Sequence, residues 1–303
     1  MNLSRRQFFS RAAVGAACTL VPSNARAEEA IAPPGALGLL YDATQCIGCQ
    51  ACVSACVEAN NKAQQQSLSE ARASERGLTT QARSTVKLYT APGSRERSFV
   101  KLQCMHCVDP ACVASCMFRA LHKDARTGIV SWTASLCVGC RYCEIVCPYH
   151  VPRFEWHAFN PRIVKCELCG SRLEKGQEPA CTSVCPTHAV IFGQRAALLA
   201  TAHKRIAAHP GQYSEDRVYG ERDGGGTQAL YLSHVTYAKL GLRQLGTESI
   251  PARHLKWQKH IYTYLAAPAA VYALLTGVLA KRWRAHKLHE EHEEEATGLK
   301  PQL

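Results

Sequence analysis

The chain has 303 residues, of which 47% are hydrophobic and 20% are charged, a composition that excludes an intrinsically disordered protein and allows one large or two modest domains. The formal net charge of +12 would suit a nucleic-acid or lipid partner. That figure treats the 17 cysteines as neutral, whereas metal-bound cysteine is a thiolate and would cancel much of the positive charge. We therefore expect no nucleic-acid partner.

Residues 1–27 have the layout of a twin-arginine export signal. The pair Arg5–Arg6 precedes a mildly apolar stretch and an A-x-A cleavage pattern that ends at Ala27. Removal of these residues would leave 32 basic against 24 acidic residues, a net charge of +8, and would take away Cys18. A chance basic amphipathic helix is the alternative. We predict that the mature body lies on the periplasmic side of the inner membrane.

The body of the chain reads as short strands with few helices. In chain order we expect a polar, partly helical insertion over Asn60–Arg83, strands over Val86–Thr90, Ser98–Leu102, Ala120–His122 and Gly128–Trp132, a closing strand over His188–Gly193, a helix over Arg195–His209, and a glycine-rich turn followed by a strand within 220–235. The glycines at 224–226 lack the sequence context of a phosphate loop. No catalytic Ser/His/Asp or paired-carboxylate motif is recognisable.

An uncharged stretch near the C-terminus has the length of a membrane span. Residues 261–280 would extend about 30 Å as a helix, the thickness of a bilayer core. Tyr262 and Tyr264 at one end and Trp283 beyond the other suit the two membrane interfaces. A buried helix of a soluble protein is the alternative. We predict a transmembrane helix over 261–280 and a cytoplasmic tail over 281–303.

The sixteen cysteines that follow the signal fall into four groups of four. They are Cys46, Cys49, Cys52 and Cys56; Cys104, Cys107, Cys112 and Cys116; Cys137, Cys140, Cys143 and Cys147; and Cys166, Cys169, Cys181 and Cys185. Each group is a triad with an outlying fourth cysteine, and a proline follows the third and fourth groups. The pattern is that of the bacterial ferredoxin run C-x2-C-x2-C-x3-C-P, which binds 4Fe–4S clusters.

Two other uses of these cysteines suit the chain less well. A disulfide framework suits a secreted chain of fewer than 80 residues, not one of this length. Structural zinc is the closer rival, because C-x2-C pairs often bind it, but zinc sites usually combine two such pairs, often with histidine. His106 and Tyr142 lie inside the cysteine runs; we expect them to be packed side chains, with a hydrogen bond to sulfur as the alternative.

In a two-cluster ferredoxin the fourth cysteine of each run ligates the cluster of the other run. That rule predicts four crossed ligand sets, one for each of four 4Fe–4S clusters. The sets are set I, Cys46, Cys49, Cys52 and Cys185; set II, Cys56, Cys166, Cys169 and Cys181; set III, Cys104, Cys107, Cys112 and Cys147; and set IV, Cys116, Cys137, Cys140 and Cys143.

We therefore predict an α+β fold in which one ferredoxin-like 2×(4Fe–4S) module is nested inside another within residues 28–250. The inner module covers about 98–160 and carries sets III and IV. The outer module covers about 36–59 plus 161–200 and carries sets I and II. A peripheral extension and the C-terminal transmembrane helix complete the chain.

Four segments resemble the four-cluster electron-transfer subunits of exported membrane oxidoreductases, and among these the HybA-type iron–sulfur subunit of periplasmic, membrane-bound nickel–iron hydrogenase. The segments are LGLLYDATQCIGCQACVSAC, KLQCMHCVDPACVASC, GCRYCEIVCPYHVPRFEW and KCELC…CTSVCPTHAVIFG. The resemblance implies a non-catalytic subunit. It would receive electrons from the hydrogenase catalytic and small subunits and pass them to an integral membrane partner that reduces quinone.

The cysteine ligands do not identify the catalytic partner. The alternative is the same relay serving a molybdenum or tungsten enzyme such as formate dehydrogenase. An enzyme in its own right would need a substrate pocket or a second cofactor motif, and a structural zinc protein would contain no iron.

Overall fold

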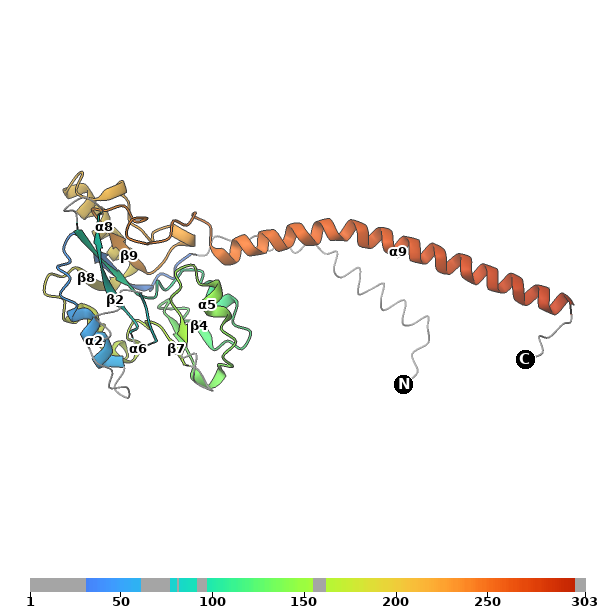
Figure 1. Cartoon of the computed structure of the whole chain (residues 1–303), viewed down its shortest axis with the longest axis horizontal. Coiled ribbons are helices and arrows are strands. Elements are labelled where there is room, and N and C mark those ends of the chain that lie inside the picture. The colour runs from blue at the N-terminus through green and yellow to red at the C-terminus, as the bar shows by residue number, and fades with distance from the viewer. Residues whose placement is uncertain (1–30, 61–76, 81, 92–96, 155–161, 298–303) are drawn as a thin grey trace. The chain divides into compact units, whose positions relative to one another are not determined.

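The computed structural model of the chain describes residues 31–60, 77–80, 82–91, 97–154 and 162–297 (Figure 1). The predicted signal over 1–27, with Cys18, lies outside the described residues, as does most of the predicted insertion over 60–83. The chain divides into two compact units, Met1–Ala252 and Arg253–Leu303.

The first unit is built on a three-stranded sheet in the order β8-β1-β9. Strand β1 (Leu37–Asp42) pairs antiparallel with β8 (Val190–Gln194) and parallel with β9 (Ala229–Leu232). The run LGLLYD is apolar at nearly every position, as a strand covered on both faces requires. Because β1 is central, the beginning and the end of the body are held in one sheet.

The two faces of β1 have different neighbours. Leu40 packs with Leu198 and Ala202 of helix α8 (Arg195–Ala208). Leu39 and Tyr41 lie in the largest core cluster, which also includes partly buried cysteines of sets I and III. Alternate side chains of a strand point to opposite faces, so one face of the sheet carries a helix and the other faces the cysteine-rich region.

Among the residues that the structure describes, three hairpins complete the strands, and two of them were predicted. Their strands are β2 (Thr85–Thr90) with β3 (Arg97–Leu102), β4 (Leu121–Lys123) with β5 (Val130–Trp132), and β6 (Arg153–Phe154) with β7 (Ile163–Val164), each pair antiparallel. The hydroxyls of Tyr41 and Tyr231 donate hydrogen bonds to the carbonyls of Phe99 and Lys101, at 2.9 and 2.8 Å. These bonds join β3 to the central sheet.

Most helices of the first unit are short and carry or adjoin a cysteine. They are α2 (Ala51–Asn60), α4 (Ala111–Ala114), α5 (Tyr142–Val146), α6 (Gly170–Leu173) and α7 (Ala180–Ser183), with single 3-10 turns at Ala134–Leu136, Ser214–Asp216 and Asp223–Gly225. Figure 1 shows the green elements β4, α5 and β7 as a lobe beside the strands β1, β2, β8 and β9.

The segment after α8 contributes to the core, so the predicted peripheral extension does not lie here. Strand β9 belongs to the central sheet, and Tyr219, Tyr231 and Tyr237 are among the largest fully buried side chains among the described residues. Tyr231 packs against Tyr41 and Tyr219 at ring-centroid distances of 5.6 and 6.2 Å. Three aromatic side chains of this size cannot be accommodated on a surface extension, so they close the core over the sheet.

Helix α9 (Ile250–Thr297) spans 48 residues and has Pro268 inside it. The predicted helix over 261–280 therefore lies within a much longer one. In the part of the chain that the structure describes, no helix is both long enough and apolar enough to cross a membrane. The side chains of residues 263, 266 and 267, within the predicted span, lie outside the described ones.

Candidate iron–sulfur centres

The four C-x2-C turns share one backbone conformation. The residue just before the second cysteine has a positive φ in every group: 70° at Gly48, 46° at His106, 70° at Gly139 and 52° at Leu168. Glycine adopts this left-handed region freely and histidine tolerates it, whereas a leucine is strained there. The internal repeat in the sequence is thus also a repeat of local geometry, which turns the chain sharply between the paired cysteines.

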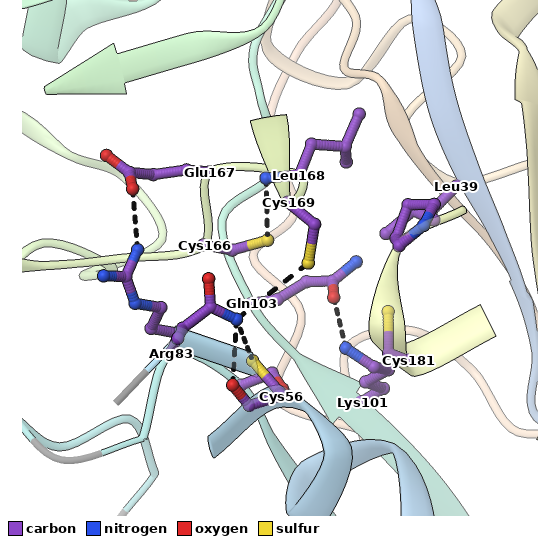
Figure 2. A pocket seen from close by; sticks show the side chains of 13 residues that line it. Leu39, Cys56, Arg83, Lys101, Gln103, Cys166, Glu167, Leu168, Cys169 and Cys181 are labelled. Atoms are coloured by element: carbon purple, nitrogen blue, oxygen red, sulfur yellow. Dashed lines mark hydrogen bonds and ion pairs between the residues drawn. The ribbon is translucent and has the colours of Figure 1, made fainter. Parts of the chain in front are cut away.

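Set II lines one cavity with an empty volume of about 340 Å³ (Figure 2). Cys56 comes from α2, Cys166 and Cys169 from the loop after β7, and Cys181 from α7. The Leu168 N–H donates to Cys166 Sγ at 3.4 Å. Segments 110 residues apart in sequence therefore bring their sulfurs to one space.

Set I lines a second cavity, also with an empty volume of about 340 Å³. Cys46, Cys49 and Cys52 come from the segment between β1 and the start of α2, and Cys185 follows α7. The fourth cysteine of the last group thus joins the triad of the first group.

Set IV lines a third cavity with an empty volume of about 330 Å³. Cys116 follows α4, and the other three cysteines lie around α5. The Leu121 N–H lies 3.5 Å from Cys116 Sγ and donates to it. Cys140 is exposed, as is Cys49 of set I.

Set III is gathered in the core. Burial, and next the nearby sulfurs of Cys147, Cys104 and Cys112, raise the pKa of the Cys107 thiol well above its ordinary value. Burial is also the largest cause of the raised pKa of the Cys112 thiol, and the nearby sulfurs of Cys104 and Cys147 raise it further. The four thiols of set III are therefore within electrostatic reach of one another.

All sixteen cysteines are free thiols in the structure. Burial raises the pKa of Cys52 and Cys147 to about 11 and that of Cys143 to about 12. Thiols of this kind stay protonated at neutral pH unless a metal replaces the proton. Soft sulfur donors in groups of four around closed spaces are the donor set of a 4Fe–4S cluster, so the residues fit that group.

Among the described residues, no three His, Cys, Asp or Glu side chains are gathered closely enough to hold a single metal ion.

His106 is a packed side chain, as the sequence predicted. It is 1% exposed, and its Nδ1 accepts a hydrogen bond from the Val130 N–H at 3.1 Å. Burial, followed by the charges of Lys165 and Lys123, lowers the pKa of His106 well below its ordinary value. Its ring is therefore neutral. Tyr142 is 52% exposed and borders the cavity of set IV.

Three polar side chains near the sulfurs were missed by the sequence analysis. Asn60 Nδ2 lies 3.8 Å from Cys56 Sγ and 3.9 Å from Cys169 Sγ, and also donates to the Cys56 carbonyl at 2.8 Å. Lys101 and Gln103 line the set II cavity. The position of Asn60, four residues after Cys56 on a helix, was a usable signal because residues four apart share a helix face.

The mixed α/β fold and the sulfur-lined cavities define an iron–sulfur protein. Residues 96–195 match the family model described as 4Fe-4S dicluster domain. The chain is 38% identical over 322 residues to the hydrogenase-2 operon protein HybA of Escherichia coli O157:H7, covering 95% of this chain and 98% of that protein.

Two formate dehydrogenase subunits of Escherichia coli K12 are also similar. The formate dehydrogenase-O iron-sulfur subunit is 31% identical over 84% of this chain and 89% of its own length. The iron-sulfur subunit of the nitrate-inducible formate dehydrogenase is 34% identical over 64% of this chain and 67% of its own length. The chain belongs to the HybA family, and it is a non-catalytic, iron–sulfur electron-transfer subunit of an oxidoreductase complex.

Proposed function

We propose that this chain relays electrons through four 4Fe–4S clusters, held by sets I to IV, from a periplasmic nickel–iron hydrogenase to a membrane partner that reduces quinone. The observation that supports the proposal is that twelve of the sixteen cysteines line three cavities, four in each, as sets I, II and IV. Each cluster, when bound, supplies a one-electron carrier. The nesting of an inner module, with sets III and IV, inside an outer module, with sets I and II, is part of this proposal.

The chain's own residues hold the carriers and keep water from them. Cys104, Cys147 and Cys166 are buried together with Val151 in one apolar cluster, and Cys143 of set IV lies in another with Leu121 and Phe154. Burial and hydrogen bonds to sulfur set the potential of an iron–sulfur cluster. Electron transfer through the clusters moves no proton, so the residues that hold them need no acid–base chemistry.

A relay must also exchange electrons with its partners, and two sets reach the surface. Cys49 of set I and Cys140 of set IV are exposed. Around Cys140, the apolar side chains of Leu136, Val138 and Tyr142 are 50 to 58% exposed. Exposed apolar patches are typical of docking surfaces. We assign contacts with the two partners to these two ends of the relay.

Location in the membrane belongs to the proposal as well. The support is the sequence: a twin-arginine pair in residues 1–27 and an uncharged stretch over 261–280. Within α9, Leu274, Leu275 and Leu279 are more than half exposed. Alkaline extraction of membranes tests the anchor. Retention of the full chain and release of a chain ending at residue 260 support it, and release of both contradicts it.

The second candidate is the same relay in a formate dehydrogenase or another molybdenum or tungsten enzyme. It is favoured by the similarity to two formate dehydrogenase iron-sulfur subunits. The match to HybA covers more of the chain at higher identity, which supports the hydrogenase.

One purification separates these proposals. The complex is isolated from membranes through a tag on this chain, and iron, nickel, molybdenum, tungsten and zinc are measured on the same sample. About sixteen irons per chain beyond the partner's own clusters, with nickel, supports the hydrogenase relay. The same iron with molybdenum or tungsten supports the second candidate, and zinc in place of iron refutes both.

A further inference from the structure

Lys101 is a buried cation without a buried carboxylate beside it. It lies in β3, is 1% exposed, and is among the largest fully buried side chains. Its Nζ donates a hydrogen bond to the amide oxygen of Gln103, itself 3% exposed. Among the described residues, the ion pairs of the structure include no carboxylate at Lys101. Lysine is almost never fully buried unless a negative group pairs with it.

The negative groups available to Lys101 are sulfurs. Its side chain borders both the set I cavity and the set II cavity. Figure 2 shows the Lys101–Gln103 pair beside Cys181 and on the same side of the cavity as Leu39. When clusters are bound, the thiolates of Cys166 and Cys181 in one cavity and of Cys52 in the other would be the negative groups around the ammonium.

The position of Lys101 is fixed by the sheet. Its carbonyl accepts the hydroxyl of Tyr231 at 2.8 Å, and the neighbouring Phe99 carbonyl accepts the hydroxyl of Tyr41 at 2.9 Å. Burial of a charge costs stability that a solvent-facing lysine would not cost. The sheet thus fixes a positive charge between two sulfur-lined cavities, an arrangement that suits an electrostatic role.

Charge counting gives the direction of the effect. A 4Fe–4S core with four thiolates carries about −2 when oxidised and about −3 when reduced. Reduction adds one electron and needs no proton. A fixed positive charge nearby favours the more negative state, and it does so strongly where water is excluded.

We infer that Lys101 is a positioning charge shared by the clusters of sets I and II, which raises the reduction potentials of both. The inference rests on the proposed function, because it requires clusters in those two cavities. The clusters of sets I and II would then differ in reduction potential from those of sets III and IV. The ligands alone do not provide this difference, because all four sets consist of cysteine.

The test is a redox titration of the purified complex, followed by electron paramagnetic resonance. Lys101→Met removes the charge and keeps most of the volume, and Lys101→Arg keeps the charge. With Met we expect the reduction equilibrium of two clusters to weaken by about tenfold, which is 59 mV for a one-electron couple. The other two clusters should change much less, and Arg should stay close to the wild type.

Lys165 provides the matched control. It is also buried, at 2% exposed, and its Nζ donates to the carbonyls of Val130 and of Cys166. Its charge acts on Cys112 of set III, lowering the pKa of that thiol against the larger effect of burial. Lys165→Met should therefore shift the cluster of set III, which Lys101→Met changes little, and should leave the cluster of set I unchanged.

Unchanged potentials in Lys101→Met with full iron content overturn the inference, and so do equal shifts with Met and Arg, which would indicate a packing effect. If Lys101→Met loses iron, Gln103→Glu is titrated instead, because it places a carboxylate on the ammonium without shortening the lysine. Lower potentials of the same two clusters then support the inference, and unchanged potentials refute it. Absence of clusters in the wild type would instead refute the proposed function.

Discussion

Cys49 and Cys56 are seven residues apart and lie in one cysteine run, yet they border different cavities. Cys56 and Cys166 are 110 residues apart and border the same one. Pairs of substitutions distinguish this crossed arrangement from one in which each run holds its own cluster. Two substitutions in one ligand set disturb one cluster, whereas two in different sets disturb two.

The magnitudes follow from four irons per cluster. We expect Cys49→Ala, Cys56→Ala and Cys166→Ala each to lower the iron content by about four per chain. Cys56→Ala with Cys166→Ala should also lose about four, because the effects of residues that share a site are not additive. Cys49→Ala with Cys56→Ala should lose about eight.

The assay is iron per chain in the purified complex, with cluster signals recorded on the same samples. Cys18→Ala is the control, since Cys18 lies in the predicted signal and belongs to no set. A loss of about eight irons for Cys56 with Cys166, together with about four for Cys49 with Cys56, would mean that each run holds its own cluster. The crossed sets would then be wrong.

Three further predictions concern the frame around the sulfurs. Gly48→Ala should lose one cluster by iron analysis, because a Cβ there would lie 2.2 Å from Phe99 Cε1 at a φ of 70°; retention of full iron would contradict this. Asp42→Asn should lower the free energy of unfolding, measured by urea titration, by about 2 kcal/mol. The reason is that the fully buried carboxylate accepts a hydrogen bond from Arg205 Nη1 at 2.9 Å. A change below about 0.5 kcal/mol would show that the ion pair is dispensable. Hydrogen bonds from the Thr127 hydroxyl and N–H lower the pKa of the Asp124 carboxyl. These bonds therefore stabilise the fold fully above the pKa of Asp124 in the unfolded chain. The stabilisation is lost as the pH falls through the lower pKa of the folded state. The difference between the thermal unfolding midpoints of wild type and Asp124→Ala should therefore be largest at pH 7 and shrink as the pH is lowered, and a constant difference would refute this.

The sequence predicted those features of the fold and site for which chemistry dictates the residue types and their spacing. Crossed ligation follows from the ferredoxin rule, and the cavities group the same cysteines that the rule groups. The hairpin of β4 and β5 was predictable because its turn is marked by Asp124 and Gly128, which has a φ of 70°. These signals are local or depend on residue type alone.

Long-range pairing and buried polar groups were not predictable in this way. Nothing in ALYL distinguishes a strand of the central sheet from a surface strand, and its partner lies at the other end of the body. Lys101 stands in a strand where alternation would place a lysine toward solvent. We infer that the sulfurs of sets I and II stabilise its charge, as water or a carboxylate usually does, and that environment exists only after folding.

The position of β1 between β8 and β9 has a consequence for biosynthesis. Sets III and IV are complete once residue 147 has been made, whereas set II needs Cys181 and set I needs Cys185. Strand β1 needs β9, where Leu230 pairs with Leu40. Chains fold from the N-terminus as they emerge, and such distant pairing is slow. Until then Cys46 to Cys56 are unshielded thiols. They would remain reduced in a cytosol but form disulfides in an oxidising compartment, so the proposed export would require the body to be finished first.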